Sequence, residues 1–336
     1  MESRDSYMRN SEKSIRISGI VFALAMLLCT MVVIVKNAYS NCLSSSIDIG
    51  LQRAVELKNI DTLYIGSSMF KQGLSPSILE KEKKDQSIFL ITYNGNSPAL
   101  EELEISYLIK KGCNIKRIYV DLYVYSASRE PNLEDSRLLF DSDLRLKNKI
   151  WKLISSRDAS ITSWWEFYVL GNNEEFILWP IYHQLVSDRY YRGGIADDGD
   201  YASSGRTHNQ LDALSVPIAD GLNISQKEAI RGIVKMCREN NTELVFVETP
   251  KYSKVERDEG YYNLMCEYIE LLDSCDVKSI LLHNRIAGSL GFENCDSSHI
   301  RYYSFDNDNP GNYNDLLHLS PEGRELFTRE MLNTGL

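Results

Sequence analysis

Short apolar runs alternate with amphipathic segments along most of the chain beyond residue 60. Five of the runs are rich in β-branched and aromatic residues and are predicted to be strands: 61–68, 87–93, 115–126, 242–250 and 277–284. Between and after them, helices are predicted at 76–84, 99–112, 225–241, 256–275 and 320–333. Strands that alternate with helices favour right-handed βαβ crossovers. We therefore expect an α/β fold: a doubly wound, mostly parallel five-stranded sheet with helices on both faces.

Residues 130–222 interrupt this alternation. Their first part is aromatic and is predicted to be helical over 146–191, and a polar, glycine-rich loop follows it. We expect a helical insertion in the domain. It is either a cover over the ligand-binding edge of the sheet or a packing subdomain, and the sequence leaves both open.

A second kind of pattern occupies the amino-terminal part of the chain. Residues 17–35 contain no charged side chain, and as a helix they would extend about 28 Å, close to the thickness of a bilayer's hydrocarbon core. Cations precede this run at Arg4, Arg9, Lys13 and Arg16, whereas only Lys36 follows it before Arg53. The bias predicts a transmembrane helix over 17–35 with its amino terminus in the cytoplasm.

The predicted organisation is then a cytoplasmic segment at 1–16, the transmembrane helix at 17–35, a linker at 36–58 and an extracytoplasmic domain at 59–336. A cleaved signal peptide is the alternative, because residues 38–40 form a small-x-small site. The apolar run is longer than is usual for a signal peptide, and Lys36 separates it from that site, which favours the uncleaved anchor.

The net charge and the cysteines limit the possible partners, metals and disulfides. The net charge of −10 argues against a nucleic-acid partner, since phosphate binding needs a basic surface. No C-x-x-C or H-E-x-x-H pattern occurs, so zinc has no support in the sequence. No other metal or cofactor is expected. Six cysteines lie outside the apolar run and permit disulfides in an exported domain: Cys42, Cys113, Cys237, Cys266, Cys275 and Cys295.

Two short motifs carry the candidate chemistry. The first predicted strand ends in Gly66-Ser67-Ser68, which is either an ordinary turn or a nucleophile at the tip of a strand. Near the other end of the chain, Asp315 and His318 precede the last predicted helix. Their spacing lets the carboxylate lie beside the imidazole and hold it in one tautomer. A serine nucleophile needs such a base and such an orienting group.

Together these motifs resemble those of the SGNH, or GDSL-like, hydrolase superfamily. The resemblance implies that Ser68 is the nucleophile, that His318 and Asp315 complete a triad, and that the backbone amides of Ser68 and Gly95 form the oxyanion hole. The sequence departs from the family at the third motif, where the third strand is not followed by asparagine. Asn94 and Asn96 are the nearby asparagines that could supply the missing side chain.

The amino-terminal anchor, the I-G-S-S and N-x-x-S-P motifs and the final D-x-x-H-L extend the resemblance to membrane-anchored members, the DltD-like and alginate-acetylation proteins. That resemblance implies a serine acyl-esterase or O-acyltransferase that acts on an acylated cell-envelope glycan or polymer, with a membrane-bound O-acyltransferase as partner. The alternative is a catalytically idle envelope protein of the same fold that binds glycan or holds such a partner. A plain secreted esterase is a third reading, which the anchor disfavours.

Overall fold

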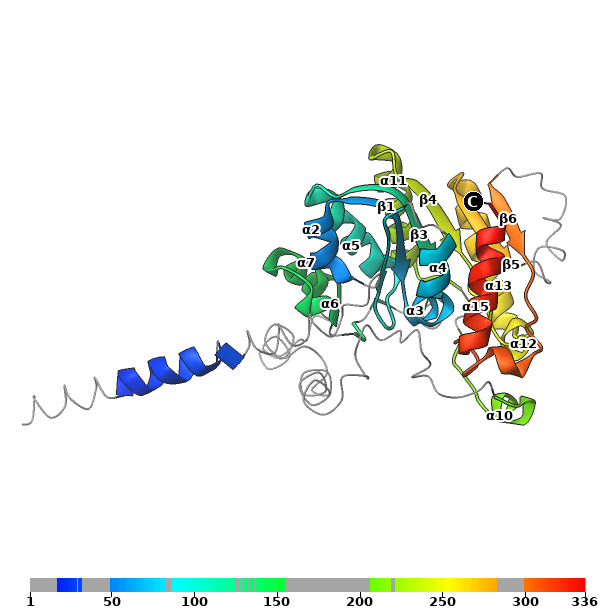
Figure 1. Ribbon diagram of the computed structural model, residues 1–336, viewed down its shortest axis with the longest axis horizontal. Helices are drawn as coiled ribbons and strands as arrows, with labels where there is room; N and C mark the ends of the chain where they lie inside the picture. The colour runs from blue at the N-terminus through cyan, green and yellow to red at the C-terminus, as the bar shows by residue number, and fades with distance from the viewer. Residues whose placement is uncertain are drawn as a thin grey trace, which may run out of the picture.

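The computed structural model describes residues 17–28, 30–31, 49–82, 86–124, 127, 130–131, 133–135, 137–154, 206–218, 221–282 and 299–335. Its centre is one six-stranded sheet in the order β2-β1-β3-β4-β5-β6, and all neighbouring strands are parallel (Figure 1). The strands are β1 (Asn59–Gly66), β2 (Ile88–Thr92), β3 (Asn114–Asp121), β4 (Glu243–Val247), β5 (Lys278–Leu282) and β6 (Ile300–Tyr303).

The α/β class and the parallel sheet are confirmed, but the prediction of five strands is wrong by one. The additional strand, β6, pairs with β5 at the edge of the sheet. It has only four residues, and Arg301 interrupts its apolar character. A strand this short does not show a period of two along the sequence, so only its pairing with β5 reveals it.

Helices cover both faces of the sheet. On one face lie α5 (Pro98–Lys110), α11 (Ile224–Glu239) and α13 (Glu259–Ser274), of which α5 packs against α11 and an ion pair joins α11 to α13. On the other face α15 (Pro321–Asn333) packs against α3 (Ser68–Gly73) and α4 (Pro76–Glu82). The remaining described helices are α2 (Gly50–Leu57), α6 (Arg137–Phe140), α7 (Leu144–Ile154), α10 (His208–Asp212), α12 (Ser253–Glu256) and the 3₁₀ turn η3 (Pro310–Asn312).

The strand order places a crevice at the end of β1. The chain crosses from β1 to β2 on one side and then returns past β1 to β3 on the other, so the connections on the two sides of β1 diverge. Open α/β sheets bind ligands at such a switch point, at the carboxyl ends of the strands. Ser67 and Ser68 directly follow β1 and therefore lie there.

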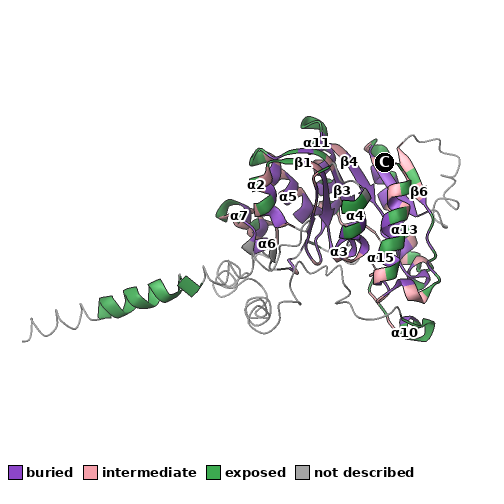
Figure 2. Cartoon of the chain, viewed as in Figure 1, coloured by how far each residue is buried: buried purple, intermediate pink, exposed green. Residues whose placement is uncertain are grey.

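Burial follows the layers. Strands β1 to β5 are mostly buried, whereas the edge strand β6 is largely not, and the long covering helices α11, α13 and α15 keep an exposed outer face (Figure 2). β1 shows this best, because its last five residues, from Thr62 onward, are all buried between the two helical layers. A strand buried on both faces has no polar alternation, which is why β1 reads as a continuous apolar run.

The segment before the sheet differs from the predicted linker. Helix α2 lies within the stretch 36–58, because Leu51 and Ala54, one turn apart, are both completely buried against the domain. Residues 17–28 and 30–31 of the apolar run are helical and exposed, and the remainder of the predicted span lies outside the described residues. Within the part of the chain that the structure describes, no helix is long and apolar enough to cross a membrane.

Four of the six cysteines outside the apolar run fall within the described ranges: Cys113, Cys237, Cys266 and Cys275 are free thiols. The described part of the predicted insertion comprises α6, α7 and α10 with their flanking residues, and residues 155–205 lie outside the described chain.

Candidate active site

The turn after β1 places Ser68 at the first position of α3. Ser67 is the residue before the helix, with extended backbone, and its hydroxyl oxygen accepts a hydrogen bond from the Met69 amide at 3.2 Å. This cap makes the chain change from strand to helix within two residues. The side chain of Ser68 consequently projects over the end of the sheet.

Asp121, the last residue of β3, stabilises this turn through two hydrogen bonds with Ser67. Its carboxylate accepts the Ser67 backbone amide at 3.0 Å and the Ser67 hydroxyl at 2.5 Å. The same carboxylate explains Gly66, because a Cβ atom on Gly66 would lie 2.6 Å from Asp121 Oδ1. The glycine of the motif is therefore required by the close approach of a neighbouring side chain.

A second acid lies against Asp121 in the core. Glu101 of α5 is completely buried, and neither of its side-chain oxygens receives a hydrogen bond from a donor among the described residues. Burial and the negative charges of Asp121 and Glu104 raise its pKa well above the usual range, and burial also raises the pKa of Asp121. A proton kept on Glu101 turns it into a donor to Asp121, which removes the conflict between two adjacent acceptors.

This arrangement predicts a pH effect on stability. Because its pKa is raised in the folded state, Glu101 retains a proton that the unfolded chain releases, and the free energy of unfolding falls as pH rises above the ordinary glutamate pKa. Glu101→Gln keeps a donor toward Asp121 without titrating. It should raise the free energy of unfolding at pH 8 by about 1–3 kcal/mol and at pH 4 by much less. Urea denaturation at both pH values measures this.

The matched control is Glu239→Gln, since Glu239 is an exposed residue of α11. It should change the free energy of unfolding equally at both pH values. An equal effect of Glu101→Gln at pH 4 and pH 8 would show that Glu101 is ionised in the fold.

His318 and Asp315 occupy one closed turn before α15. Asp315 Oδ1 accepts the backbone amides of Leu317 at 2.8 Å and His318 at 2.9 Å. The turn is closed at its ends by a bridge between Tyr313 and Leu319, and the Asn314 amide donates to the His318 carbonyl at 2.9 Å. The backbone thus fixes both side chains before the helix begins.

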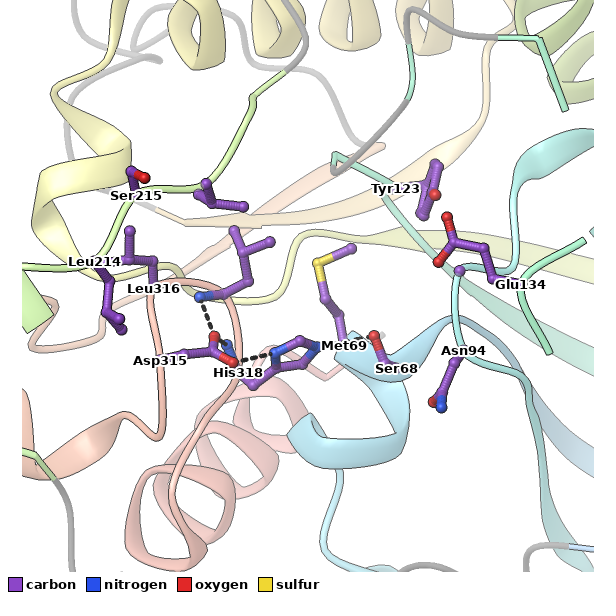
Figure 3. A pocket seen from close by; sticks show the side chains of 13 residues that line it. Ser68, Met69, Asn94, Tyr123, Glu134, Leu214, Ser215, Asp315, Leu316 and His318 are labelled. Carbon is purple, nitrogen blue, oxygen red and sulfur yellow. Dashed lines mark hydrogen bonds and ion pairs between the residues drawn. The ribbon is translucent and has the colours of Figure 1, made fainter. Parts of the chain in front are cut away.

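The structure brings the two distant motifs together in a continuous hydrogen-bonded chain (Figure 3). Ser68 Oγ lies 2.8 Å from His318 Nε2, and His318 Nδ1 lies 2.8 Å from Asp315 Oδ2. Ser68 and His318 are 250 positions apart in the sequence. Distances of about 2.6–3.2 Å are those required for proton transfer from a serine to its base.

The electrostatics of Asp315 suit an orienting role. Burial alone would raise its pKa, but the hydrogen bond and charge of His318 and the two backbone amides bring the pKa below its ordinary value. The carboxylate is therefore ionised near neutral pH. An ionised Asp315 can accept a hydrogen bond from the protonated His318 Nδ1, which leaves Nε2 free to accept a hydrogen bond from Ser68.

Gly95 and Ser68, the residues predicted to form an oxyanion hole, line the same pocket. Gly95 lines the pocket next to Ser68, and neither its amide nor that of Ser68 has a hydrogen-bond acceptor among the described residues. Gly95 has a φ of +63°, and a Cβ atom there would lie 2.3 Å from Glu134 Oε2, so only glycine fits this position. The pair can serve as donors to an oxyanion.

The two asparagines predicted as a further donor lie in different places. Asn94 lines the pocket, on the side of Ser68 that faces away from His318 (Figure 3). Asn96 is buried in the core instead, where its amide nitrogen lies 3.2 Å from Glu104 and 3.4 Å from the Gly66 carbonyl oxygen. Its side chain therefore packs beside the Gly66-Ser67-Ser68 turn in the core and does not line the pocket.

The pocket around Ser68 has a volume of about 370 Å³. Besides the residues already described, it is lined by Met69, Tyr123, Glu134, Leu214, Ser215, Val216, Leu316 and Leu317. Glu134 and residues 214–216, which line the pocket, belong to the segment 130–222 that was predicted to be an insertion. Glu134 has no motif around it, and only its position against Gly95 reveals it.

Known proteins show only a distant structural similarity to this chain. No protein-family model matches the sequence, and no curated protein matches it. Among solved structures, the chain is similar to a mutant of Axe2, an acetyl-xylooligosaccharide esterase from Geobacillus, at 12% identity and a TM-score of 0.34, covering 82% of this chain and 94% of that one. A catalytic mutant of Axe2, an acetylxylan esterase from Geobacillus stearothermophilus, is similar at 11% identity and a TM-score of 0.33, covering 82% and 93%. A likeness this distant carries no conclusion about substrate or mechanism.

Proposed function

We propose that this protein is a serine acyl-esterase or O-acyltransferase of the SGNH type, with Ser68, His318 and Asp315 as its catalytic triad. The observation that supports it is the hydrogen-bonded chain from Ser68 to Asp315 at the mouth of a pocket. An unrelated pair of residues 250 positions apart has no reason to meet in this geometry. The amides of Ser68 and Gly95 would complete the site.

The proposed reaction has two steps. Ser68 Oγ attacks the acyl carbonyl carbon while His318 Nε2 takes the hydroxyl proton, and the oxyanion that forms accepts hydrogen bonds from the amides of Ser68 and Gly95. His318 then gives the proton to the departing alcohol, leaving an acyl-Ser68. Water or a sugar hydroxyl, deprotonated by His318, attacks this ester; the bond to Ser68 Oγ breaks, His318 returns the proton to Ser68, and the acid or the transferred ester is released.

The direct test is turnover of a small acyl ester by the detergent-solubilised full chain. We expect hydrolysis of p-nitrophenyl acetate with an initial burst of nitrophenol, because the acyl-enzyme forms before it is released. The burst should equal the protein concentration. Absence of both burst and turnover would contradict the proposed chemistry.

Two features favour the non-catalytic alternative. The Glu134 carboxylate lies against Gly95, where a negative charge would oppose an oxyanion, and the side-chain donor of the third motif is absent. Losing one oxyanion donor costs about 10²–10³ in rate. An idle protein that binds an acylated glycan, or that holds a membrane-bound O-acyltransferase, would keep the pocket and give no burst.

We further propose that the domain is extracytoplasmic, is anchored by residues 17–35 and acts on an acylated cell-envelope glycan or polymer. The support is in the sequence: nineteen residues without charge, with four cations before them and one shortly after. In this placement the site faces polymers outside the membrane, and a membrane-bound O-acyltransferase is the natural source of acyl groups.

Topology can be checked with a tag at the carboxyl terminus. In intact cells or spheroplasts, added protease should remove the tag, because residues after the anchor lie outside. A tag that is protected until the membrane is permeabilised would contradict the orientation. A mature amino terminus near Asn41 would instead show a cleaved signal peptide.

A further inference from the structure

A second pocket lies on a flank of the domain, well away from Ser68. It has a volume of about 420 Å³ and is formed where the end of α5 packs against α7. Helix α5 starts just after the Gly95 loop and runs for 13 residues, so its far end is about 20 Å from the catalytic turn. Figure 1 shows α2, α5 and α7 together on this flank. The pocket is therefore separate from the proposed active site.

Cationic side chains dominate its lining. Four of the seven lining residues are basic: Lys110, Lys111, Arg145 and Lys149. Asp143 is the one acid that lines it, and it forms an ion pair with Lys111 at 2.8 Å. This concentration of positive charge occurs in a chain whose net charge is −10.

The other three cations lack an acidic hydrogen-bond partner among the described residues. Lys110 donates to the neutral hydroxyl of Ser106 at 2.8 Å, and neither Arg145 nor Lys149 forms an ion pair with a described acid. Glu102 is a further carboxylate on α5; it is half-buried and interacts with the charges of Lys110 and Lys149 without a hydrogen bond to either. Among the described residues, the pocket therefore has more cationic than anionic side chains.

These cations also repel one another. Partial burial, the adjacent Lys110 and the charge of Arg145 together lower the pKa of Lys149. A cluster that destabilises its own charged form is stabilised when an anion enters it. Arginine supplies a planar fork of donors and lysine a compact charge, which together match the tetrahedral oxygens of a phosphate group.

We propose that the pocket between α5 and α7, lined by Lys110, Arg145 and Lys149, binds a phosphate group. Its size allows the phosphate to carry a small substituent such as glycerol. The group belongs either to a lipid headgroup or to a soluble or polymer-borne phosphate. The flank position favours the headgroup, because α2, the first helix of the domain after the proposed anchor, packs against α5.

The test is a calorimetric titration of the detergent-solubilised full chain with inorganic phosphate at constant ionic strength. We expect saturable binding that Arg145→Gln with Lys149→Gln weakens about tenfold or more. The control pair Lys235→Gln with Arg329→Gln removes the same charge from exposed sites on α11 and α15 and should bind as the wild type does. Equal affinity in both double variants, or no binding by the wild type, would overturn the proposal.

Further measurements identify the source of the phosphate group and separate phosphate binding from acyl chemistry and from folding. A soluble short-chain phosphatidylglycerol, used below its micelle concentration, should bind more tightly than inorganic phosphate if the ligand is a headgroup, and no more tightly if it is a free or polymer-borne phosphate. Ser68→Ala should bind phosphate normally, so the outcome is independent of the proposed acyl chemistry. Urea denaturation of the Arg145→Gln/Lys149→Gln variant should match that of the wild type, which separates loss of binding from loss of fold.

Discussion

Replacing Ser68 by alanine should abolish labelling of the protein by a fluorophosphonate and lower ester turnover by roughly 10³-fold or more. The reagent forms a covalent bond only with a serine whose proton is withdrawn by a base, and His318 Nε2 lies 2.8 Å from Ser68 Oγ. Mass spectrometry of the wild type should place the adduct on Ser68. Gel-based labelling of the two proteins under identical conditions gives the comparison.

The matched control is the neighbouring serine. Ser67→Ala removes the hydroxyl that bonds to Asp121 and caps Met69, but it leaves the backbone bond to Asp121 in place. Labelling should then be roughly fivefold to tenfold slower, not absent. Labelling that persists in Ser68→Ala would refute the assignment of the nucleophile. An unlabelled wild-type protein would favour the idle alternative.

Asp315→Asn should reduce turnover by roughly 10²–10⁴-fold with little change in KM. The asparagine oxygen can still accept the amides of Leu317 and His318, so the turn should be kept. Its NH₂ group, however, would donate to His318 Nδ1, and the ring would then carry its proton on Nε2. In that tautomer His318 cannot accept the Ser68 proton.

Asp308→Asn is the control for Asp315→Asn. Asp308 lies in the same region of the chain, forms an exposed ion pair with Arg257, and does not line the pocket. Turnover should be unchanged within about twofold, since exposed ion pairs contribute little. A loss in Asp315→Asn that also appears in KM, or that accompanies a lower melting temperature, would point to a damaged turn instead of a wrong tautomer.

Local patterns were sufficient for most of the architecture. The apolar run that becomes β1, the helical periods of α11 and α13, and the Ser320-Pro321 start of α15 are each readable within a few residues. The sequence does not predict helix α2, because the helix is short and its few apolar residues show no clear period. They are recognised as a helix face only once the surface that buries them is known. Strand β6 was missed because it exists through its pairing with β5.

In the candidate site, too, one contact is local in the sequence and another is not. Asp315 and His318 interact within one turn, so their spacing alone indicated that the carboxylate could orient the ring. The family resemblance suggested Ser68 as their partner, but the 2.8 Å contact depends on β1 and the turn before α15 meeting at one edge of the sheet. No local pattern encodes a contact between residues 250 positions apart.

The α/β class, the position of the Gly-Ser-Ser turn and the Asp-x-x-His unit follow from the amino-acid sequence alone, because each depends on neighbouring residues. The side chains that surround them are known only from the folded structure. Asp121 and Glu101 come from β3 and α5, and packing of these elements behind β1 makes them a buried acid pair under Ser67. Glu134 and the basic pocket at the end of α5 likewise arise from segments distant in sequence, whose charges interact only after the chain has folded.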